Sequence, residues 1–473
     1  MLLMIEAAFM GVALGVCYIY GEYDDAICFI WSILTTLGAG GAMILIPRKS
    51  QGNDMGKREG ILLTGLTWVI FSVFGMLPFI WGSPKLDVAS AYFETMSGFT
   101  TTGVTTISAV ESVSHGILMW RAITHLLGGM GIILFTLAVI PMLNKQSGIQ
   151  LFNAEVTGIT HDKVRPRISH TAKSLWMVYI VLSVTLIILL WLGPMNLFDA
   201  ICHSFSTIST GGFSTKNASI EYYNSDYLKI VLSIFMLISG ANFALLYKFA
   251  IGDRKALLKN DTTRWYLTIV AIAILIIGLK FILSGNYSTY VELAIDTTFQ
   301  VIAAITTTGF TGSDYTSWTG LPIIVILFIM VLGSCAGSTT GGVKVDRFIV
   351  IVKNMRNELY KLLHPNTITT IRVNGKVLSY DLISKTGAFM SAYTVLAILG
   401  VTILEETGMT FFDSMFASIS CLSNIGLGYG ISGNSFADIC ATSKWTLSAL
   451  MLAGRLEIFT ILITFTKHFW NKE

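Results

Sequence analysis

Long apolar runs alternate with short polar segments along almost the whole chain. About 20 consecutive apolar residues span the hydrocarbon core of a bilayer, and runs of this kind recur through the sequence. Two of them precede all the others, at residues 3–20 and 26–47. The pattern predicts an all-α polytopic membrane protein. The clearest later runs are 61–80, 175–192, 266–283, 321–332 with its flanks, and 447–465.

A shorter pattern, rich in Thr, Ser and Gly, recurs four times between the apolar runs. Its copies read TTTGV at 100–104, STGGF at 209–213, TTTGF at 306–310 and SNIGL at 423–427. Thirteen residues before the shared glycine stand Ser90, Asp199, Asp296 and Asp413. These are residue types that cap helix N-termini, so each copy predicts a capped half-helix followed by an extended strand.

Together the two patterns predict four pseudo-symmetric repeats around a central pore. Each repeat consists of a spanning helix, a half-helix, a strand and a second spanning helix. With the two additional N-terminal helices, the total expected is ten spanning helices and four half-helices. The predicted boundaries are 1–50 for the N-terminal pair, then 51–145, 165–253, 262–360 and 378–473 for the four pore repeats.

The Thr/Gly-rich strands are candidates for a cation filter. Non-helical backbone is tolerated at membrane depth only where it is buried or lines a cavity, and backbone carbonyls can replace the hydration shell of a cation. The half-helices would point their negative C-terminal ends at the same centre. The residue before the glycine varies, which favours carbonyls over side chains as ligands. The predicted filter residues are Thr101, Thr102, Gly103, Thr210, Gly211, Gly212, Thr307, Thr308, Gly309, Asn424, Ile425 and Gly426.

A glycine-rich segment, 333–344, interrupts the second helix of the third repeat, whereas the other three second helices read as continuous. Glycine and hydroxyl residues at this density break a helix. With few side-chain contacts to hold it, this segment could switch between conformations, as a gate must. Arg455 is an intramembrane charge, which is usually functional or paired. Its partner could be Glu457 or another acid, although residues two apart on a helix do not face each other. The predicted gating residues are Gly337, Ser338, Thr339, Thr340, Gly341, Gly342 and Arg455.

Composition and charge support a membrane protein and orient it. Hydrophobic residues make up 53% of the chain and charged residues 12%, with a mean hydropathy of +0.69; soluble domains carry about 25% charged residues. Lys and Arg are concentrated in four connecting segments and the C-terminal tail, which the positive-inside rule places in the cytoplasm together with both termini. The basic residues include Arg48, Lys49, Lys57 and Arg58; Lys145, Lys163, Arg165, Arg167 and Lys173; Arg254, Lys255, Lys259 and Arg264; and Arg347 through Lys385.

Over nearly its whole length, the sequence resembles the Trk/Ktr/HKT superfamily of potassium transport proteins, and most closely the bacterial Trk-type membrane subunit of that superfamily. The two additional N-terminal helices favour the Trk-type branch. The motifs that carry the resemblance are the four strands, residues 75–79, 120–132 and 333–344, and GRLEI at 454–458. Two departures are His125, where glutamine is expected more often, and the weak fourth strand at Asn424.

The resemblance implies several properties beyond the residue pattern. It implies potassium selectivity, which accompanies glycine at Gly103, and a gating loop at 337–342 beneath the filter and near Arg455. It implies a homodimer in the bacterial cytoplasmic (inner) membrane. It also implies a cytoplasmic, nucleotide-binding (RCK-type) regulatory subunit. We expect nothing in this chain to bind that nucleotide.

Other functions fit the sequence less well. A potassium symporter coupled to sodium or protons remains open, because discontinuous helices also occur in coupled transporters; the absence of carboxylates from the predicted filter favours a channel. The seven histidines form neither an HExxH motif nor a recognisable catalytic set. We therefore expect no enzymatic activity, no catalytic residue, no cofactor other than K⁺ as the transported ion, and no nucleic-acid partner. We expect His203 to be a hydrogen-bonded packing residue, and Arg121 to lie near the outer water.

Overall fold

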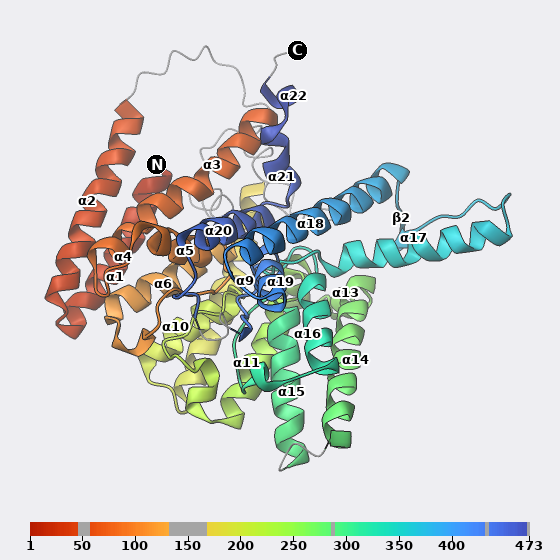
Figure 1. The fold of residues 1–473 in the computed structure, drawn as a ribbon, viewed down its shortest axis with the longest axis horizontal. Coiled ribbons are helices and arrows are strands. Elements are labelled where there is room, and N and C mark those ends of the chain that lie inside the picture. Colours follow the sequence, from red (N-terminus) through yellow and green to blue (C-terminus); the bar gives the residue numbers. More distant parts are fainter. Residues whose placement is uncertain (46–56, 132–167, 285–288, 431–434, 471–473) are drawn as a thin grey trace.

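The computed structural model describes residues 1–45, 57–131, 168–284, 289–430 and 435–470. They form a bundle of helices with one small antiparallel hairpin, β1 (Arg372–Val373) and β2 (Lys376–Val377). Two N-terminal helices, α1 (Leu2–Tyr20) and α2 (Tyr23–Leu45), pack against each other at one edge of the bundle (Figure 1). Gly21 joins them in the left-handed conformation, with φ of 73°.

After this pair, the same order of elements occurs four times, as predicted. Each unit has a first helix, a half-helix and a second helix. The first unit contains α3 (Lys57–Gly75), α4 (Leu77–Trp81), α5 (Val88–Phe99) and α6 (His115–Gly129), and the second contains α9 (Ile168–Trp191), α10 (Leu197–Ile208), α11 (Asp226–Ser239) and α12 (Phe243–Ala250). The third contains α14 (Asp261–Ser284), α15 (Tyr290–Ile305), α16 (Leu321–Leu332) and α17 (Val345–Leu363), and the fourth contains α18 (Tyr380–Glu406), α19 (Phe411–Leu422), α20 (Ala441–Arg455) and α21 (Phe459–Leu462).

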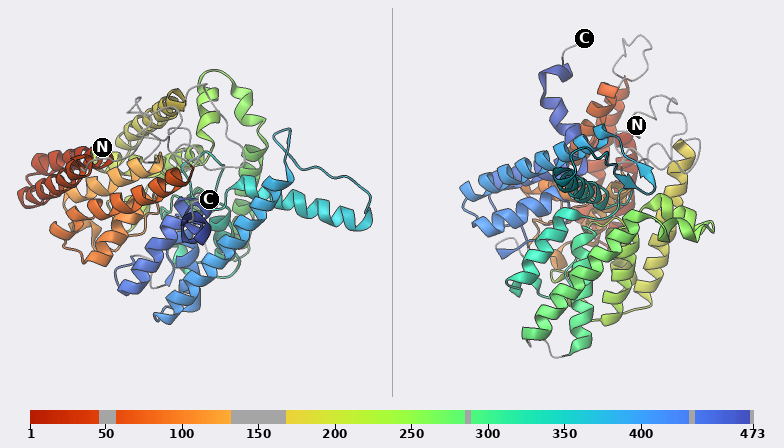
Figure 2. Two further views of the ribbon diagram at one scale, coloured as in Figure 1. Left: turned by 90° about the horizontal axis from the view of Figure 1, so that it is seen from above. Right: turned by 90° about the vertical axis from the view of Figure 1, so that its right-hand side faces the viewer.

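Short helices connect or end these units. The helix α17 begins in the bundle and extends beyond it on the side opposite α1 and α2, with the hairpin beside it (Figures 1 and 2). The short helices are α13 (Arg254–Leu258), α22 (Lys467–Trp470), η1 (Val110–Ser112), η2 (Ser219–Tyr223), η3 (Tyr315–Ser317) and η5 (Ile463–Phe465).

Ten spanning helices were expected, and fewer than ten are uninterrupted among the described residues. Six helices are long and apolar enough to cross a membrane, or up to eight if each bent pair counts as one span. The helix α11 bends by 103° into α12, and α20 bends by 109° into the segment that follows. The helix α6 ends at Gly129, and α16 ends at Leu332. The second helix is therefore interrupted or ended in all four units, and not in the third alone.

Two of the breaks, those after α6 and α20, share a physical cause, because each occurs where the second helix reaches the C-terminal end of a half-helix. A Cβ on Gly128 would overlap the carbonyl oxygen of Phe99, the last residue of α5. In the same way, a Cβ on Gly454 would overlap the carbonyl oxygen of Leu422, the last residue of α19. Such close approach of two backbones requires glycine, and glycine also weakens the helix at that point.

The predicted caps of the half-helices are also wrong, although their register is right. The N-caps are Asp87, Asn196, Thr289 and Thr410. Ser90, Asp199 and Asp413 are the third residue of their helices, and Asp296 lies two turns inside α15. Three of these side chains have tertiary partners instead: Ser90 accepts from Lys444 at 2.9 Å, Asp199 from Thr215 at 2.6 Å and Tyr223 at 2.8 Å, and Asp296 pairs with Lys229 at 2.6 Å.

Candidate pore and gate

The four Thr/Gly-rich segments leave the ends of the half-helices and meet in a closed ring. A Cβ on Gly103 would overlap the carbonyl oxygen of Gly211 in the next segment along the chain. The same relation joins the other segments in order and returns to the first. The remaining pairs are Gly212 with Thr308, Gly309 with Ile425, and Gly426 with Thr102. Each shared glycine therefore lies against a backbone carbonyl of its neighbour, where a side chain cannot fit.

The backbone of each segment alternates in a way that lines up its carbonyls. The residue two before the shared glycine has a positive φ of 52° to 55°, and the glycine itself one of 73° to 94°. The residue between them does not have a positive φ. Alternation of this kind turns successive peptide groups the same way, so neighbouring carbonyls face one side. Positive φ is uncommon outside glycine and is concentrated at functional sites; here it falls on Thr101, Thr210, Thr307 and Asn424.

The fourth segment, which looked weak in the sequence, follows the same geometry. Asn424 has a φ of 54°, close to that of the three threonines. Its amide group donates to the hydroxyl of Thr102 at 3.0 Å and to the carbonyl of Met451 at 2.9 Å. The asparagine therefore ties the fourth segment to the first, which closes the ring on the side where the chain is discontinuous.

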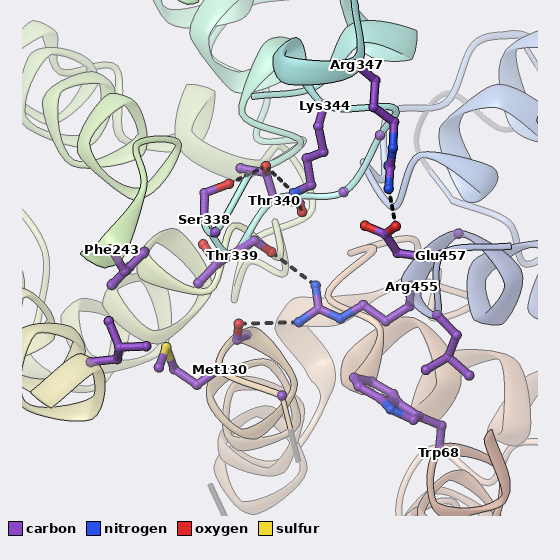
Figure 3. A pocket seen from close by; sticks show the side chains of 18 of the residues that line it. Trp68, Met130, Phe243, Ser338, Thr339, Thr340, Lys344, Arg347, Arg455 and Glu457 are labelled. Atoms are coloured by element: carbon purple, nitrogen blue, oxygen red, sulfur yellow. Dashed lines mark hydrogen bonds and ion pairs between the residues drawn. The ribbon is translucent and has the colours of Figure 1, made fainter. Parts of the chain in front are cut away.

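Two cavities lie on opposite sides of this ring. One, of about 340 Å³ and called the outer cavity below, is lined by all four shared glycines and by polar residues that include Arg121 of α6, Lys216 and Asp314. The other, of about 120 Å³ and called the inner cavity below, is lined by residues 337–342 and by Arg455 (Figure 3). The ring and the segment 337–342 thus separate the two cavities.

The segment 333–344 lies directly beneath the ring. The backbone amide of Gly341 donates to the hydroxyl of Thr307 at 2.8 Å, and a Cβ on Gly341 would overlap the carbonyl oxygen of Ser423. The hydroxyl of Thr339 donates to the carbonyl of Ile208, the last residue of α10, at 3.1 Å. The segment therefore touches the inner ends of strands from three units.

The segment is not loosely held, contrary to the sequence-based expectation. The amide of Asn242 donates to the Ala336 carbonyl at 2.7 Å, and the Phe243 backbone amide donates to Gly337 at 2.9 Å. Ser334 donates to the carbonyl of Ile305, the last residue of α15, at 2.8 Å. The bonds from Asn242 and Phe243 can form because the helix is interrupted between α11 and α12, where these two residues lie. Only the break in the third unit was predicted from the sequence, so these hydrogen-bond partners were not predicted.

Arg455 joins the segment to the first unit. Its guanidinium donates to the Thr339 carbonyl at 3.1 Å, to the Gly128 carbonyl and to the Gly129 carbonyl at 3.3 Å, and it approaches the Thr101 hydroxyl at 3.3 Å. Figure 3 shows the guanidinium pointing at Thr339, with Trp68 on its other side. Glu457, the alternative partner, pairs with Arg347 instead.

Three cationic side chains, Lys344, Arg347 and Arg455, surround the inner cavity (Figure 3). The ammonium group of Lys344 donates to the carbonyl and the hydroxyl of Thr340, the latter at 3.0 Å. Glu457 is the one carboxylate that lines this cavity among the described residues, and it is paired with Arg347. The cavity therefore carries a net positive charge, which disfavours a cation there.

Comparisons with known proteins agree with this architecture. The sequence model of the TrkH family, described as a cation transport protein, matches residues 33–472. The chain belongs to the TrkH family. It is 37% identical to the Trk system potassium uptake protein TrkH of Escherichia coli strain K12 over 435 residues, covering 91% of this chain and 90% of that protein. It is 32% identical to the potassium uptake protein TrkI of Halomonas elongata over 474 residues, covering 99% and 95%.

A solved structure shows the same fold. The crystal structure of the potassium transporter TrkH from Vibrio parahaemolyticus superposes with a TM-score of 0.88 at 33% identity, covering 99% of this chain and 98% of that one. This likeness confirms the fold class predicted from the sequence. The family is one of transporters, which also confirms that the chain is not an enzyme.

Other predicted residues of this TrkH-family chain are placed as follows. Arg121 lines the outer cavity but is itself buried, and it pairs with Glu94 of α5 at 2.9 Å. His203 is a packing residue, as expected, bonded to the Asp199 carbonyl at 2.8 Å and to Ser214 at 2.9 Å. The basic residues 48, 49, 145, 163, 165 and 167 lie outside the described residues.

Sequence analysis missed two important contributors to the site. Glu94 accepts from the backbone amide of Thr106 at 2.8 Å and from Arg121, so it fixes the strand that leaves the first ring segment. Asp346, at the start of α17, accepts from the Ala336 backbone amide at 2.9 Å and from Thr262. The available signals were an acidic residue within a half-helix (Glu94) and one two residues after Lys344 (Asp346). Their partners are distant in the sequence, so these signals did not identify them.

Proposed function

We propose that this chain takes up potassium across the bacterial cytoplasmic membrane through the ring of backbone carbonyls described above. The proposal rests on the closed ring of contacts in which each shared glycine lies against a backbone carbonyl of the next strand. Rings of carbonyls substitute for the hydration shell of K⁺. Relatives named as potassium uptake proteins cover nine-tenths or more of the chain, which supports potassium as the transported ion.

In this proposal the ion meets the outer cavity first and loses its water at the ring. The proposed ligands are carbonyl groups of residues 101–103, 210–212, 307–309 and 424–426. The half-helices α5, α10, α15 and α19 end directly at these strands, so the negative ends of their dipoles add to the attraction for a cation. None of these twelve residues is acidic, which leaves selectivity to carbonyl number and spacing.

We propose that residues 337–342 and Arg455 form the gate and that the described arrangement is its closed state. The segment lies beneath the strands, and the guanidinium of Arg455 puts a positive charge beside the same path. Opening would require the Arg455–Thr339 bond to break. Because Asp346 of α17 holds the Ala336 amide, a movement of α17 would be transmitted directly to the segment.

The proposed partners are a second copy of this chain and a cytoplasmic RCK-type regulatory subunit, with the lipid bilayer around them. The basic residues of α17 support a cytoplasmic side for this helix under the positive-inside rule, and both termini are then cytoplasmic. Arg356 and Lys361 lie in the C-terminal half of α17, the helix that extends beyond the bundle (Figure 1). A projecting basic helix connected to the gate is well suited to receive a regulatory movement.

The test is ion flux into liposomes that contain the purified protein. A channel predicts potassium flux driven by a potassium gradient alone, with much less flux when sodium replaces potassium. Coupled symport, the alternative, predicts that a sodium or proton gradient drives potassium uphill. If neither a sodium gradient nor a proton gradient drives potassium against its own gradient, coupled symport is excluded. If the fluxes of sodium and potassium are equal, the proposed filter is refuted.

A further inference from the structure

The second ring strand differs from the other three at the residue before its shared glycine. In the first, third and fourth strands this residue has a buried side chain: Thr102, Thr308 and Ile425. The threonine hydroxyls bond within their own strands, Thr102 to Thr100 at 2.8 Å and Thr308 to Thr306 at 2.9 Å. The second strand has Gly211 in this place, so it lacks the side chain that supports the others from behind.

The imidazole of His125 occupies the missing position. A Cβ on Gly211 would overlap Nδ1, Cγ and Cε1 of the His125 ring. Gly211 is not among the residues with positive φ, so its backbone conformation would itself admit a side chain. The ring of His125, and no demand of the local backbone, is therefore what excludes a side chain from this strand.

His125 is held in place by the elements around the second strand. Its Nδ1 lies 3.1 Å from the hydroxyl of Ser206, whose carbonyl accepts the backbone amide of Gly211 at 2.7 Å. Its ring stacks on Phe213, with centroids 4.2 Å apart and an interplanar angle of 14°. The side chain is fully buried, and it contacts the second strand on both sides of Gly212.

Arg121, one turn before His125 on α6, contacts the same strand. The guanidinium of Arg121 lies over the Phe213 ring at 4.1 Å and donates to the Ser214 carbonyl at 3.1 Å. The helix of the first unit thus fixes the strand of the second unit through its side chains. The other three strands carry their own support at this level.

We propose that His125 is a positioning residue for potassium selection: its imidazole replaces the absent side chain at Gly211 and holds the carbonyl groups of the second strand in the ring. This inference rests on the proposed filter function. A ring that loses support on one side can narrow or widen, so it discriminates less well between K⁺ and the smaller Na⁺. His125 acts through Gly211 and does not touch the ion.

The test moves the supporting side chain from the helix to the strand. His125→Ala removes the support, and Gly211→Thr introduces a clash with the ring. The double variant Gly211→Thr/His125→Ala gives the second strand the same residue as the first and third. We measure the potassium-to-sodium permeability ratio in liposomes, and the folded fraction by size-exclusion chromatography in detergent.

We expect each single substitution to lower the permeability ratio by about threefold or more, and the double variant to recover it, because contacting residues couple with factors of this size. His125→Phe, which keeps a flat ring against Gly211 and Phe213, should retain a ratio within about twofold of the parent. If His125 only stabilised α6, a threonine at position 211 of the strand would not restore the permeability ratio that His125→Ala loses.

An unchanged ratio in folded His125→Ala, or a double variant no better than the two single losses combined, overturns the inference. If His125→Ala does not fold, recovery of folded protein by the double variant supports the exchange, and its failure to recover contradicts it. Gly103→Ser serves as the reference. If Gly103→Ser also leaves the permeability ratio unchanged, the filter proposal fails. If Gly103→Ser lowers the ratio and His125→Ala does not, only the role of His125 is refuted.

Discussion

Replacing Arg455 with alanine should open the pore in the absence of any regulatory subunit. The substitution removes the donor of the 3.1 Å bond to the Thr339 carbonyl, which joins this arginine to residues 337–342. It also removes the bonds to the carbonyls of Gly128 and Gly129. The positive charge beside the proposed ion path disappears at the same time.

The size of the effect follows from the bond to Thr339. A hydrogen bond to a charged group contributes about 1.5–3 kcal/mol, and each 1.4 kcal/mol corresponds to about a tenfold change in an equilibrium constant. The opening equilibrium should therefore shift by about 10- to 100-fold towards the open state. The bonds from Asn242 and Phe243 to the segment remain in place, so opening is favoured but is not complete.

Potassium flux into liposomes, measured without a regulatory subunit, should rise by about tenfold or more in Arg455→Ala. Arg455→Lys is the matched control, because it keeps the charge and loses the planar pair of donors; its flux should lie between those of the parent and Arg455→Ala. Selectivity should change little in either variant, since the ring strands are intact. A well-folded Arg455→Ala protein that conducts no faster than the parent would refute the gate assignment.

Three further perturbations test the packing and the partner surface. Lys229→Met alone should destabilise the protein by about 3–5 kcal/mol, because it leaves Asp296 buried without its partner, whereas Lys229→Met/Asp296→Leu should recover most of the loss; equal thermal stability of the single variant and the parent in detergent would argue against a buried pair. Glu94→Gln should cost a similar amount and should lower the permeability ratio as well, since Glu94 fixes the strand after the first ring segment; loss of stability with an unaltered ratio would limit Glu94 to a structural role. Arg356→Glu/Lys361→Glu should weaken capture of the regulatory subunit from membranes without changing intrinsic flux, and capture equal to the parent's would remove this surface from consideration.

The parts of the site that sequence predicted best are those fixed by local backbone requirements. Four glycines in one register indicated four equivalent strands, and Gly103, Gly212, Gly309 and Gly426 lie in one closed ring. Periodicity of the apolar runs indicated the order of helices. Both signals are local, so they do not depend on which distant segments meet.

The errors arose where a tertiary contact decides between local alternatives. Asp87 and Asn196 are as good N-caps as the residues three positions later, and nothing local chooses between them. Glycines inside an apolar run are ambiguous between a tolerated helix residue and a break. At Gly128 and Gly454 the choice is made by half-helix carbonyls from elsewhere in the chain. The hydrogen bonds that hold the gate segment follow from these breaks and were missed with them.

The central claim is that potassium is selected by a ring in which each shared glycine lies against the carbonyl of its neighbour. Its most direct test is the potassium-to-sodium permeability ratio of Gly103→Ser in liposomes. The matched control is Gly38→Ser, where an added Cβ meets no atom within 4 Å. We predict a clear loss of the ratio in Gly103→Ser and none in Gly38→Ser, with both proteins folded. A folded Gly103→Ser protein with the parent's permeability ratio would contradict the account.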